Sequence, residues 1–145
     1  MPVDIVLENG TRATINARQH QWHADEPADA GGADSAPTPG EMMLGALGSC
    51  MAITCRLYAE RKGWDLQRVE VTLDYERFKG GDYPAHEGSD AFVHEVREAL
   101  AFHGDLDDKQ RQRLRDIAIV ILLPLLIASL SVMFLLAIPP SGYGL

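Results

Sequence analysis

The chain has few cysteines, few cations and, at its C-terminal end, no charge at all. Two cysteines in 145 residues are too few for a disulfide framework, and the N-terminal stretch lacks the basic and apolar regions of a secretory signal peptide. We therefore expect a reducing, cytoplasmic environment. Lys and Arg number 13 against 21 Asp and Glu, a net charge of −8, and this shortage of cations argues against a non-specific nucleic-acid binder.

The charge distribution divides the chain into two parts. All charged residues lie in 1–116 and none in 117–145, so we expect one acidic domain over 1–116 followed by an apolar tail. Of the 22 residues at 117–138, 19 are apolar, which reaches the length of a membrane-spanning helix. The cations just before it would keep the domain cytoplasmic. The pattern leaves open whether 117–138 contacts a membrane or is an aberrant C-terminus produced by a change of reading frame.

The first half of the domain predicts strands and then a helix. Apolar and polar residues alternate at 2–8 and 11–18 around Asn9-Gly10, which predicts a β-hairpin with a tight turn, and a third strand is predicted at 20–24. Residues 24–40 are rich in Asp, Gly and Pro and predict a loop. Residues 41–62 are apolar on nearly every face of a helix, which is typical of a buried helix.

The second half predicts a strand, an ambiguous segment and a helix. Clean alternation at 67–78 predicts a half-solvated strand, and 79–91 predicts a loop. Residues 92–102 fit both a helical stripe and a strand face, and their composition favours a helix. After it, Asp105 or Asp107 can cap a helix whose acids precede its bases.

The side chains that could carry chemistry each have a structural explanation as well. A thiol such as Cys50 in the middle of a helix is most often an inert core residue unless a cation lies nearby. Cys55 lies about 140° around the helix and about 7.5 Å along it, too far for a disulfide with Cys50. Glu41 at the helix start is explained by the helix dipole, and His20 with His23 lacks the further ligands of a metal site. No zinc, phosphate-loop or dinucleotide motif is present, so neither a cofactor nor a metal is expected.

Several of these segments together resemble one family. The stretches ADEP at 24–27, GGADSAPTPGEMMLGALGSCMAIT at 31–54 and YAERKGW at 58–64 resemble the OsmC/Ohr family of thiol peroxidases. VEVTLDYER at 69–77, DYPAHE at 82–87 and GDLDDKQRQRL at 104–114 continue the resemblance, which covers about residues 20–118.

This resemblance implies an α+β fold, in which an antiparallel sheet packs on a long buried central helix. It also implies an intertwined homodimer with its active sites at the dimer interface, and it makes 92–102 a strand. The implied activity is reduction of organic hydroperoxides or hydrogen peroxide by Cys50, in oxidative-stress defence, with an external thiol or dithiol as reductant. Glu41 stands where the family has a glutamate that holds an arginine beside the thiolate. Arg12 and Arg18 are both available for that role, and we favour Arg18.

One departure from the family limits this interpretation. The family continues after its last helix with a stretch whose cysteine resolves the oxidised one, whereas this chain has no cysteine after Cys55. The alternative function is therefore a non-catalytic OsmC-like dimer, tethered to a membrane or truncated.

Overall fold

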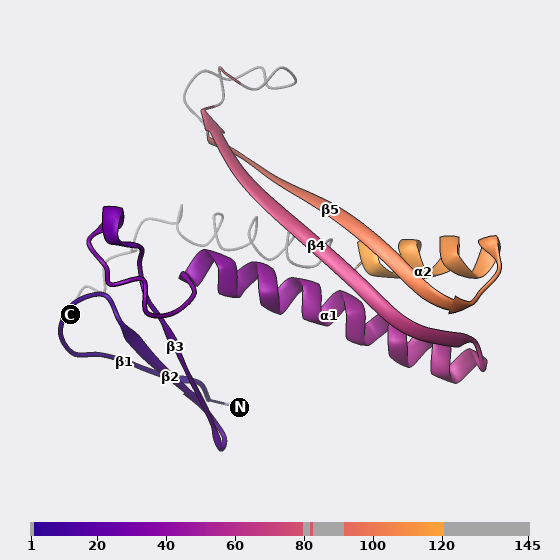
Figure 1. Ribbon diagram of the computed structural model, residues 1–145, viewed down its shortest axis with the longest axis horizontal. Coiled ribbons are helices and arrows are strands. Elements are labelled where there is room, and N and C mark those ends of the chain that lie inside the picture. The colour runs from indigo at the N-terminus through magenta and orange to yellow at the C-terminus, as the bar shows by residue number, and fades with distance from the viewer. Residues whose placement is uncertain (1, 80–81, 83–91, 121–145) are drawn as a thin grey trace, which may run out of the picture. The chain divides into compact units, whose positions relative to one another are not determined.

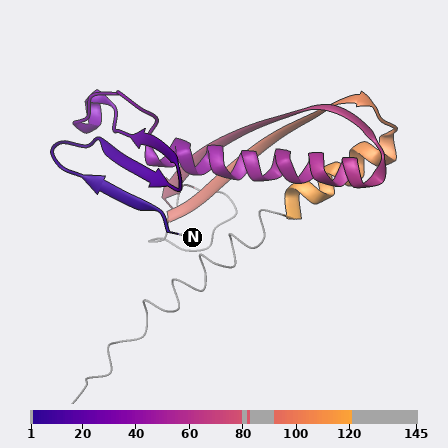
Figure 2. The ribbon, with the colours of Figure 1, turned by 90° about the horizontal axis from the view of Figure 1, so that it is seen from below.

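The computed structural model describes residues 2–79, 82 and 92–120 (Figures 1 and 2). The loop predicted at 79–91 and the tail predicted at 117–138 lie mostly outside these residues. In chain order the elements are β1 (Asp4–Leu7), β2 (Ala13–Ala17), β3 (His20–Ala24), the short helix η1 (Ala28–Ala30), α1 (Pro39–Lys62), β4 (Asp65–Lys79), β5 (Phe92–Asp105) and α2 (Asp108–Val120).

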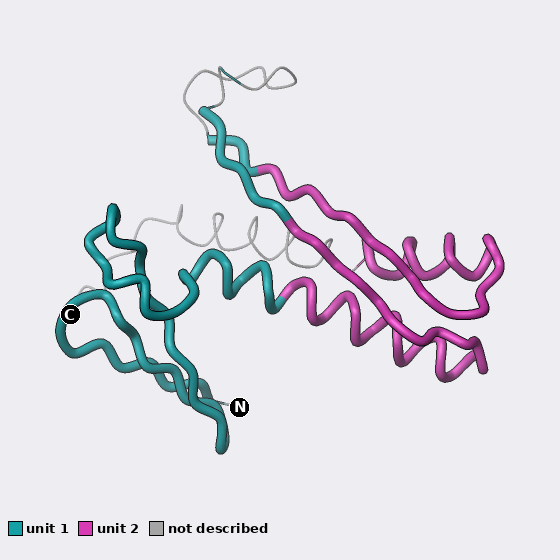
Figure 3. The backbone as a smooth tube through the Cα atoms, viewed as in Figure 1, with its two compact units in different colours: residues 1–46, 74–94 teal, residues 47–73, 95–145 magenta. Residues whose placement is uncertain are grey.

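The chain forms two compact units, which are described separately (Figure 3). The first unit contains residues 1–46 and 74–94, and the second contains residues 47–73 and 95–145. Helix α1 and the strands β4 and β5 continue from one unit into the other.

The first unit contains an antiparallel sheet in the order β1-β2-β3. Both the predicted hairpin and the predicted third strand are confirmed. The turn is longer than predicted, because Leu7 pairs with Ala13 and leaves residues 8–12 outside the ladder. Only Gly10 in this turn has a positive φ, of 74°, whereas a two-residue type I′ turn needs positive φ at both central positions.

A buried carboxylate organises the loop after β3. Asp25 is 1% exposed, and its Oδ1 accepts hydrogen bonds from Thr11 Oγ1 at 2.6 Å and from the N–H of Glu26 at 2.9 Å. Its Oδ2 accepts bonds from the N–H of Ser35 at 3.0 Å and from Ser35 Oγ at 2.7 Å. The bond from Thr11 and then those from Ser35 hold the pKa of Asp25 well below its ordinary value. These bonds fasten the loop to the start of the sheet.

The second unit has a core between its two helices and the paired strands β4 and β5. Its buried residues are Met51, Cys55, Ala59, Leu66, Phe102, Leu106, Leu114 and Ala118. Helix α1 packs on β4 at Gly48, where an added Cβ would lie 3.5 Å from side-chain atoms of Val71 and Leu73, an ordinary van der Waals contact.

The segment 92–102 is a strand, so the helix favoured by composition is wrong and the strand implied by the resemblance is confirmed. Pairing with β4 places Phe102 in the core, and this tertiary contact overrides a weak helical pattern.

The predicted final helix is confirmed, with Asp107 as its cap. Asp107 Oδ1 accepts the N–H of Gln110 at 2.8 Å, and Gln110 Oε1 accepts the N–H of Asp107 at 3.0 Å. The helix α2 continues to Val120 and buries Ala118 completely. The position 116/117, where we expected the domain to end, therefore lies inside a packed helix.

In the single chain, the burial of α1 is one-sided rather than all-round as the sequence suggested. Met51, Cys55 and Ala59 are buried, while Met43, Ile53 and Leu57 are 57%, 58% and 47% exposed. By length and mean hydropathy α1 could cross a membrane. A single helix of this kind is weak evidence, because the core helix of a water-soluble protein passes the same test.

Candidate active site

The two thiols of α1 lie in opposite environments. Cys50 is exposed and Cys55 is fully buried. The thiol of Cys55 donates a hydrogen bond to the carbonyl oxygen of Leu114 at 3.5 Å, and burial raises its pKa. Because the thiolate is the nucleophilic form, Cys55 is held in its unreactive state and only Cys50 is accessible to a reagent.

Glu41 forms a reciprocal cap at the start of α1. Its Oε2 accepts hydrogen bonds from the N–H of Thr38 at 2.8 Å and from Thr38 Oγ1 at 3.0 Å, and its own N–H donates to Thr38 Oγ1 at 3.2 Å. These bonds, the backbone one first, lower the pKa of Glu41. The pattern Thr-x-x-Glu is the sequence signature of a capping box, so Thr38 could have been identified from the sequence and was missed. Both accepted bonds go to Oε2, and among the described residues Oε1 remains available for a cation.

Helix geometry limits how Glu41 and Cys50 can share an arginine. They are nine residues apart on one continuous helix, which corresponds to about 13.5 Å along the axis and half a turn around it. Half a turn places the two side chains on opposite sides of an ideal helix, so their positions in the sequence do not by themselves bring them to one arginine.

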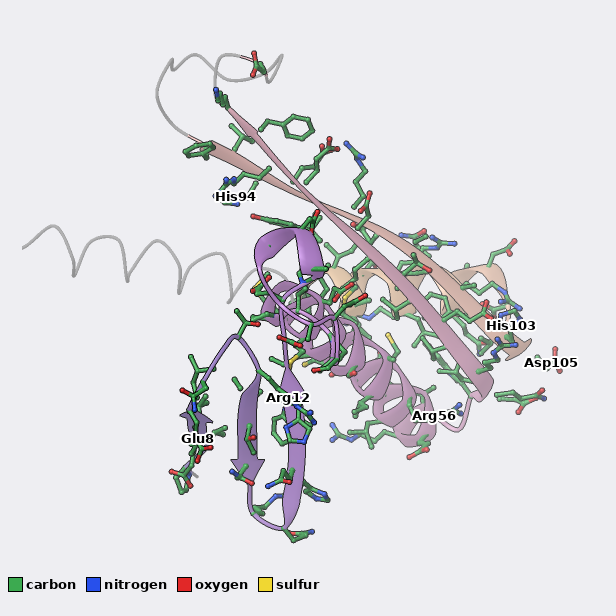
Figure 4. All side chains as sticks on the ribbon, turned by 60° about the vertical axis from the view of Figure 1, so that its left-hand side comes forward. Glu8, Arg12, Arg56, His94, His103 and Asp105 are labelled. Atoms are coloured by element: carbon green, nitrogen blue, oxygen red, sulfur yellow. The ribbon has the colours of Figure 1, made fainter. Side chains whose placement is uncertain are left out.

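Arg12 and Arg18, the two candidate arginines, flank β2 at its opposite ends. They are six residues apart along an extended segment, a separation of about 20 Å. Arg18 is exposed in the turn between β2 and β3, with φ of 55°. Arg12 and Glu8, both labelled in Figure 4, are among the residues that line a pocket of about 480 Å³. A single site can therefore use only one of them.

The left-handed backbone of Arg18 is unusual for a residue with a side chain. Left-handed φ is strained for such residues, and glycine adopts it at lower cost. Ala17 pairs with His20 across the turn, and two-residue hairpin turns of this kind need a positive φ at their first central residue, which is Arg18. Arg12, Arg18 and Glu41 belong to the first unit and Cys50 to the second, so the structure describes each of them within its own unit only.

Two pairs of polar side chains between β4 and β5 were not predicted from the sequence. His103 Nε2 lies 3.0 Å from Glu70 Oε2, and this contact, followed by the charge of Arg68, lowers the pKa of Glu70. The hydroxyl of Tyr75 lies 2.5 Å from Nδ1 of His94, and the two rings stack. Figure 4 labels both histidines. The alternating pattern predicted β4, but it carried no information about which residues of β5 face it.

No cluster of three or more His, Cys, Asp or Glu side chains suited to a metal ion occurs in residues 2–79, 82 and 92–120. Of the histidine pair considered above, His23 has its Nδ1 at 3.3 Å from Thr14 Oγ1, and His20 is exposed.

Comparisons with known proteins identify the fold. A family model described as OsmC-like protein matches residues 31–119, more than half of the chain. A protein from Psychrobacter arcticus, assigned to the osmotic stress induced and detoxification response, is 21% identical with a TM-score of 0.64 and 80% of each chain covered. The OsmC like protein of Mycoplasma pneumoniae is 18% identical, with a TM-score of 0.63, and the match covers 81% of this chain and 78% of that one. The organic hydroperoxide resistance protein OsmC of Legionella pneumophila is 15% identical, with a TM-score of 0.57, covering 81% and 80%.

At these identities the likeness to solved structures shows the fold alone. It confirms the α+β fold with antiparallel sheets that the resemblance implied. No match was found among curated proteins.

Proposed function

Since the chain belongs to the family of OsmC-like proteins, we propose that it is a thiol-dependent peroxidase that uses Cys50 to reduce organic hydroperoxides or hydrogen peroxide. The observation that carries this proposal is the contrast between the two thiols. Cys50, inside the matched segment, is exposed, while Cys55 is buried and bonded to a carbonyl. Proteins of this fold include one named for organic hydroperoxide resistance, which supports a role in oxidative-stress defence.

The chemistry assigns one step to Cys50 and a second to an external reductant. The thiolate attacks one peroxide oxygen, the O–O bond breaks, the alcohol leaves and Cys50 becomes a sulfenic acid. Cys55 cannot resolve this sulfenic acid, because helix geometry and burial keep its sulfur on another face. An external thiol or dithiol therefore returns Cys50 to the thiol and releases water.

The proposed assistants of Cys50 are Arg18 and Glu41. A guanidinium stabilises the negative charge of the thiolate and of the departing oxygen. Oε1 of Glu41 is suited to orient it, because the bonds from Thr38 both go to Oε2. We further propose that the chain works as a homodimer, because the exposed apolar side of α1 needs a cover that the described residues do not supply.

Peroxide consumption by single-thiol variants tests the proposal. The full chain, kept in solution with a mild detergent, is assayed with cumene hydroperoxide and dithiothreitol. Cys55→Ala should retain most of the activity and Cys50→Ala should lose it. If Cys50→Ala consumed peroxide as fast as the unchanged chain, Cys50 would not be the nucleophile. If none of the three proteins consumed peroxide, the non-catalytic dimer, which the lack of any cysteine after Cys55 supports, would take its place.

The two arginines are separated by a matched pair of substitutions. Arg18→Gly removes the cation at a position where glycine relieves backbone strain, so the unfolding temperature should stay the same or rise. Activity should nevertheless fall about 100-fold, the usual effect of removing a charge-stabilising donor. Arg12→Gln is the control and should leave activity within about twofold. The reverse result would assign the role to Arg12.

A further inference from the structure

The chain contains two asparagines, and the structure places them in opposite settings. Asn9 precedes Gly10 in the turn between β1 and β2, and both residues are exposed. Asn16 precedes Ala17 in β2, the central strand of the sheet, and its Oδ1 accepts a hydrogen bond from Gln21 Nε2 at 2.9 Å. One asparagine is therefore held by the sheet, and the other lies outside it.

The turn does not restrain the peptide between Asn9 and Gly10. Residues 8–12 lie outside the ladder, and a Cβ added at Gly10 would meet no atom of a non-neighbouring residue within 4 Å. Over the ranges that the structure describes, neither the N–H of Gly10 nor the side-chain amide of Asn9 makes a hydrogen bond. Glycine also restricts backbone rotation less than any other residue. The nitrogen of Gly10 can therefore approach the side-chain carbonyl carbon of the asparagine before it.

We propose that Asn9 is a site of spontaneous deamidation. Asparagine is one of the thermolabile residues of proteins. The backbone nitrogen of Gly10 loses its proton and attacks Cγ of Asn9, a C–N bond forms, and the side-chain nitrogen leaves as ammonia. Water then opens the cyclic imide at either of its carbonyl groups and gives aspartate or isoaspartate. The sum is the uptake of a water and the loss of an ammonia, so the reaction needs no co-reactant other than water.

The product changes the charge of the pocket at this turn. Asn9 lines the same pocket as Glu8 and Arg12, which contribute a carboxylate and a guanidinium. A further carboxylate at position 9 makes the pocket acidic and gives Arg12 a second anionic neighbour. The net charge of the chain, −8 before the reaction, becomes more negative by one unit, and ion-exchange chromatography detects this change.

Trypsin separates the two asparagines, because it cuts after Arg12 and Arg18 and leaves Asn9 in 1–12 and Asn16 in 13–18. The full chain, in a mild detergent, is incubated at mildly alkaline pH, digested and compared with a sample taken at the start. Segment 1–12 should gain about 1 Da and elute as two forms, aspartate and isoaspartate. This change should be at least about tenfold faster than the same change in 13–18, where a hydrogen bond and the ladder must open first. The rate should rise with pH, because the attacking nitrogen must lose its proton.

Denaturation supplies the structural control. In guanidinium chloride the rate at Asn9 should stay within about threefold of its rate in the folded chain, whereas the rate at Asn16 should rise, because unfolding releases only Asn16 from the sheet. Asn9→Gln is the matched variant and should keep 1–12 unchanged, since a glutamine would have to close a larger ring. Cys50→Ala should deamidate at the unchanged rate, because the reaction uses no thiol.

The other outcomes would overturn the inference and leave the peroxidase proposal untouched, since none of them concerns Cys50. An unchanged 1–12 after the full incubation would contradict it directly. A rate at Asn9 that is much slower in the folded chain than in guanidinium chloride would show that the turn shields the peptide. Equal rates at Asn9 and Asn16 in the folded chain would show that the turn has no special role. A gain of about 1 Da in 1–12 of Asn9→Gln would place the change on another residue.

Discussion

The different burial of the two thiols predicts a large difference in their rates of alkylation. Two variants each keep a single thiol: Cys55→Ala keeps Cys50, and Cys50→Ala keeps Cys55. Each folded protein is treated with iodoacetamide at neutral pH. Cys50 should react at the rate of an exposed thiol. Cys55 is fully buried, so it should react only when the helices α1 and α2 separate locally.

The structure gives a lower limit for the cost of that separation. The carbonyl of Leu114 accepts the thiol hydrogen of Cys55, and the Leu114 side chain is itself 0% exposed. Exposing one such leucine costs about 1.5–3 kcal/mol, and the loss of the neighbouring Ala118 contact adds to it. With about 1.4 kcal/mol per tenfold change in rate, an opening cost of about 1.5–3 kcal/mol makes Cys55 at least about 10-fold slower than Cys50, and about 100-fold slower at the upper value.

The assay is the time course of added mass, with both proteins repeated in denaturant as the control. In denaturant the two rates should converge, because neither thiol is then protected. A ratio near one in the folded state would mean that the helix contact around Leu114 is absent in solution. A faster Cys55 would refute the assignment of Cys50 as the accessible thiol.

Three further predictions concern stability and the tail. Asp25→Asn should lower the urea midpoint at neutral pH, and the difference in midpoint from the unchanged chain should shrink as the pH falls below about 4. A carboxylate whose pKa is lowered by folding stabilises the fold fully above its unfolded pKa, and this stabilisation is lost as the pH falls towards the folded pKa. Gly104→Ala should lower the free energy of unfolding by about 3 kcal/mol or more, measured by denaturant titration, since φ is 137° and the new Cβ would lie 1.9 Å from the Asp65 carbonyl oxygen. The full chain should remain in the membrane fraction after carbonate extraction, whereas a chain that ends at Val120, which keeps α2 intact, should be released. A full chain that is monodisperse in the absence of detergent would contradict this prediction.

The parts of the fold that were predictable are those set by local patterns. Alternation identified β4, and the acid-to-base order with Asp107 located α2. The turn at Asn9-Gly10 was predicted too short, because the register that lengthens it depends on pairing of β1 with β2. Periodicity could not distinguish a strand from a helix at 92–102. The strand is selected by the packing of Phe102 in a core whose other members include residues far away in the sequence, such as Met51 and Cys55.

The candidate site divides in the same way. The sequence could place Cys50 and Cys55 on different faces of one helix, because helical periodicity is local. It could not identify the group that contacts the buried thiol of Cys55, since that group lies on α2, nearly sixty residues later in the chain. The capping role of Glu41 was readable from Thr38 three residues earlier. Its second proposed role, to hold an arginine beside Cys50, came only from the resemblance to the OsmC/Ohr family.

A single substitution separates these two roles of Glu41. Glutamine is also found at this position of a capping box, because its side-chain oxygen can accept the same hydrogen bonds from Thr38. Glu41→Gln should therefore keep α1 capped, and the unfolding temperature should change by only a few degrees. The neutral amide cannot hold a guanidinium by charge, so peroxide consumption should fall about tenfold or more if Glu41 orients the arginine of the site.

Thr38→Val is the matched variant, because it removes the hydroxyl of the cap and leaves the carboxylate charged. It should lower the unfolding temperature and affect activity less than Glu41→Gln does. Suppose that Glu41→Gln keeps full activity, and that Thr38→Val loses activity only in proportion to its lower unfolding temperature. Glu41 would then act only as a cap of α1. The arginine beside Cys50 would then be held by another group.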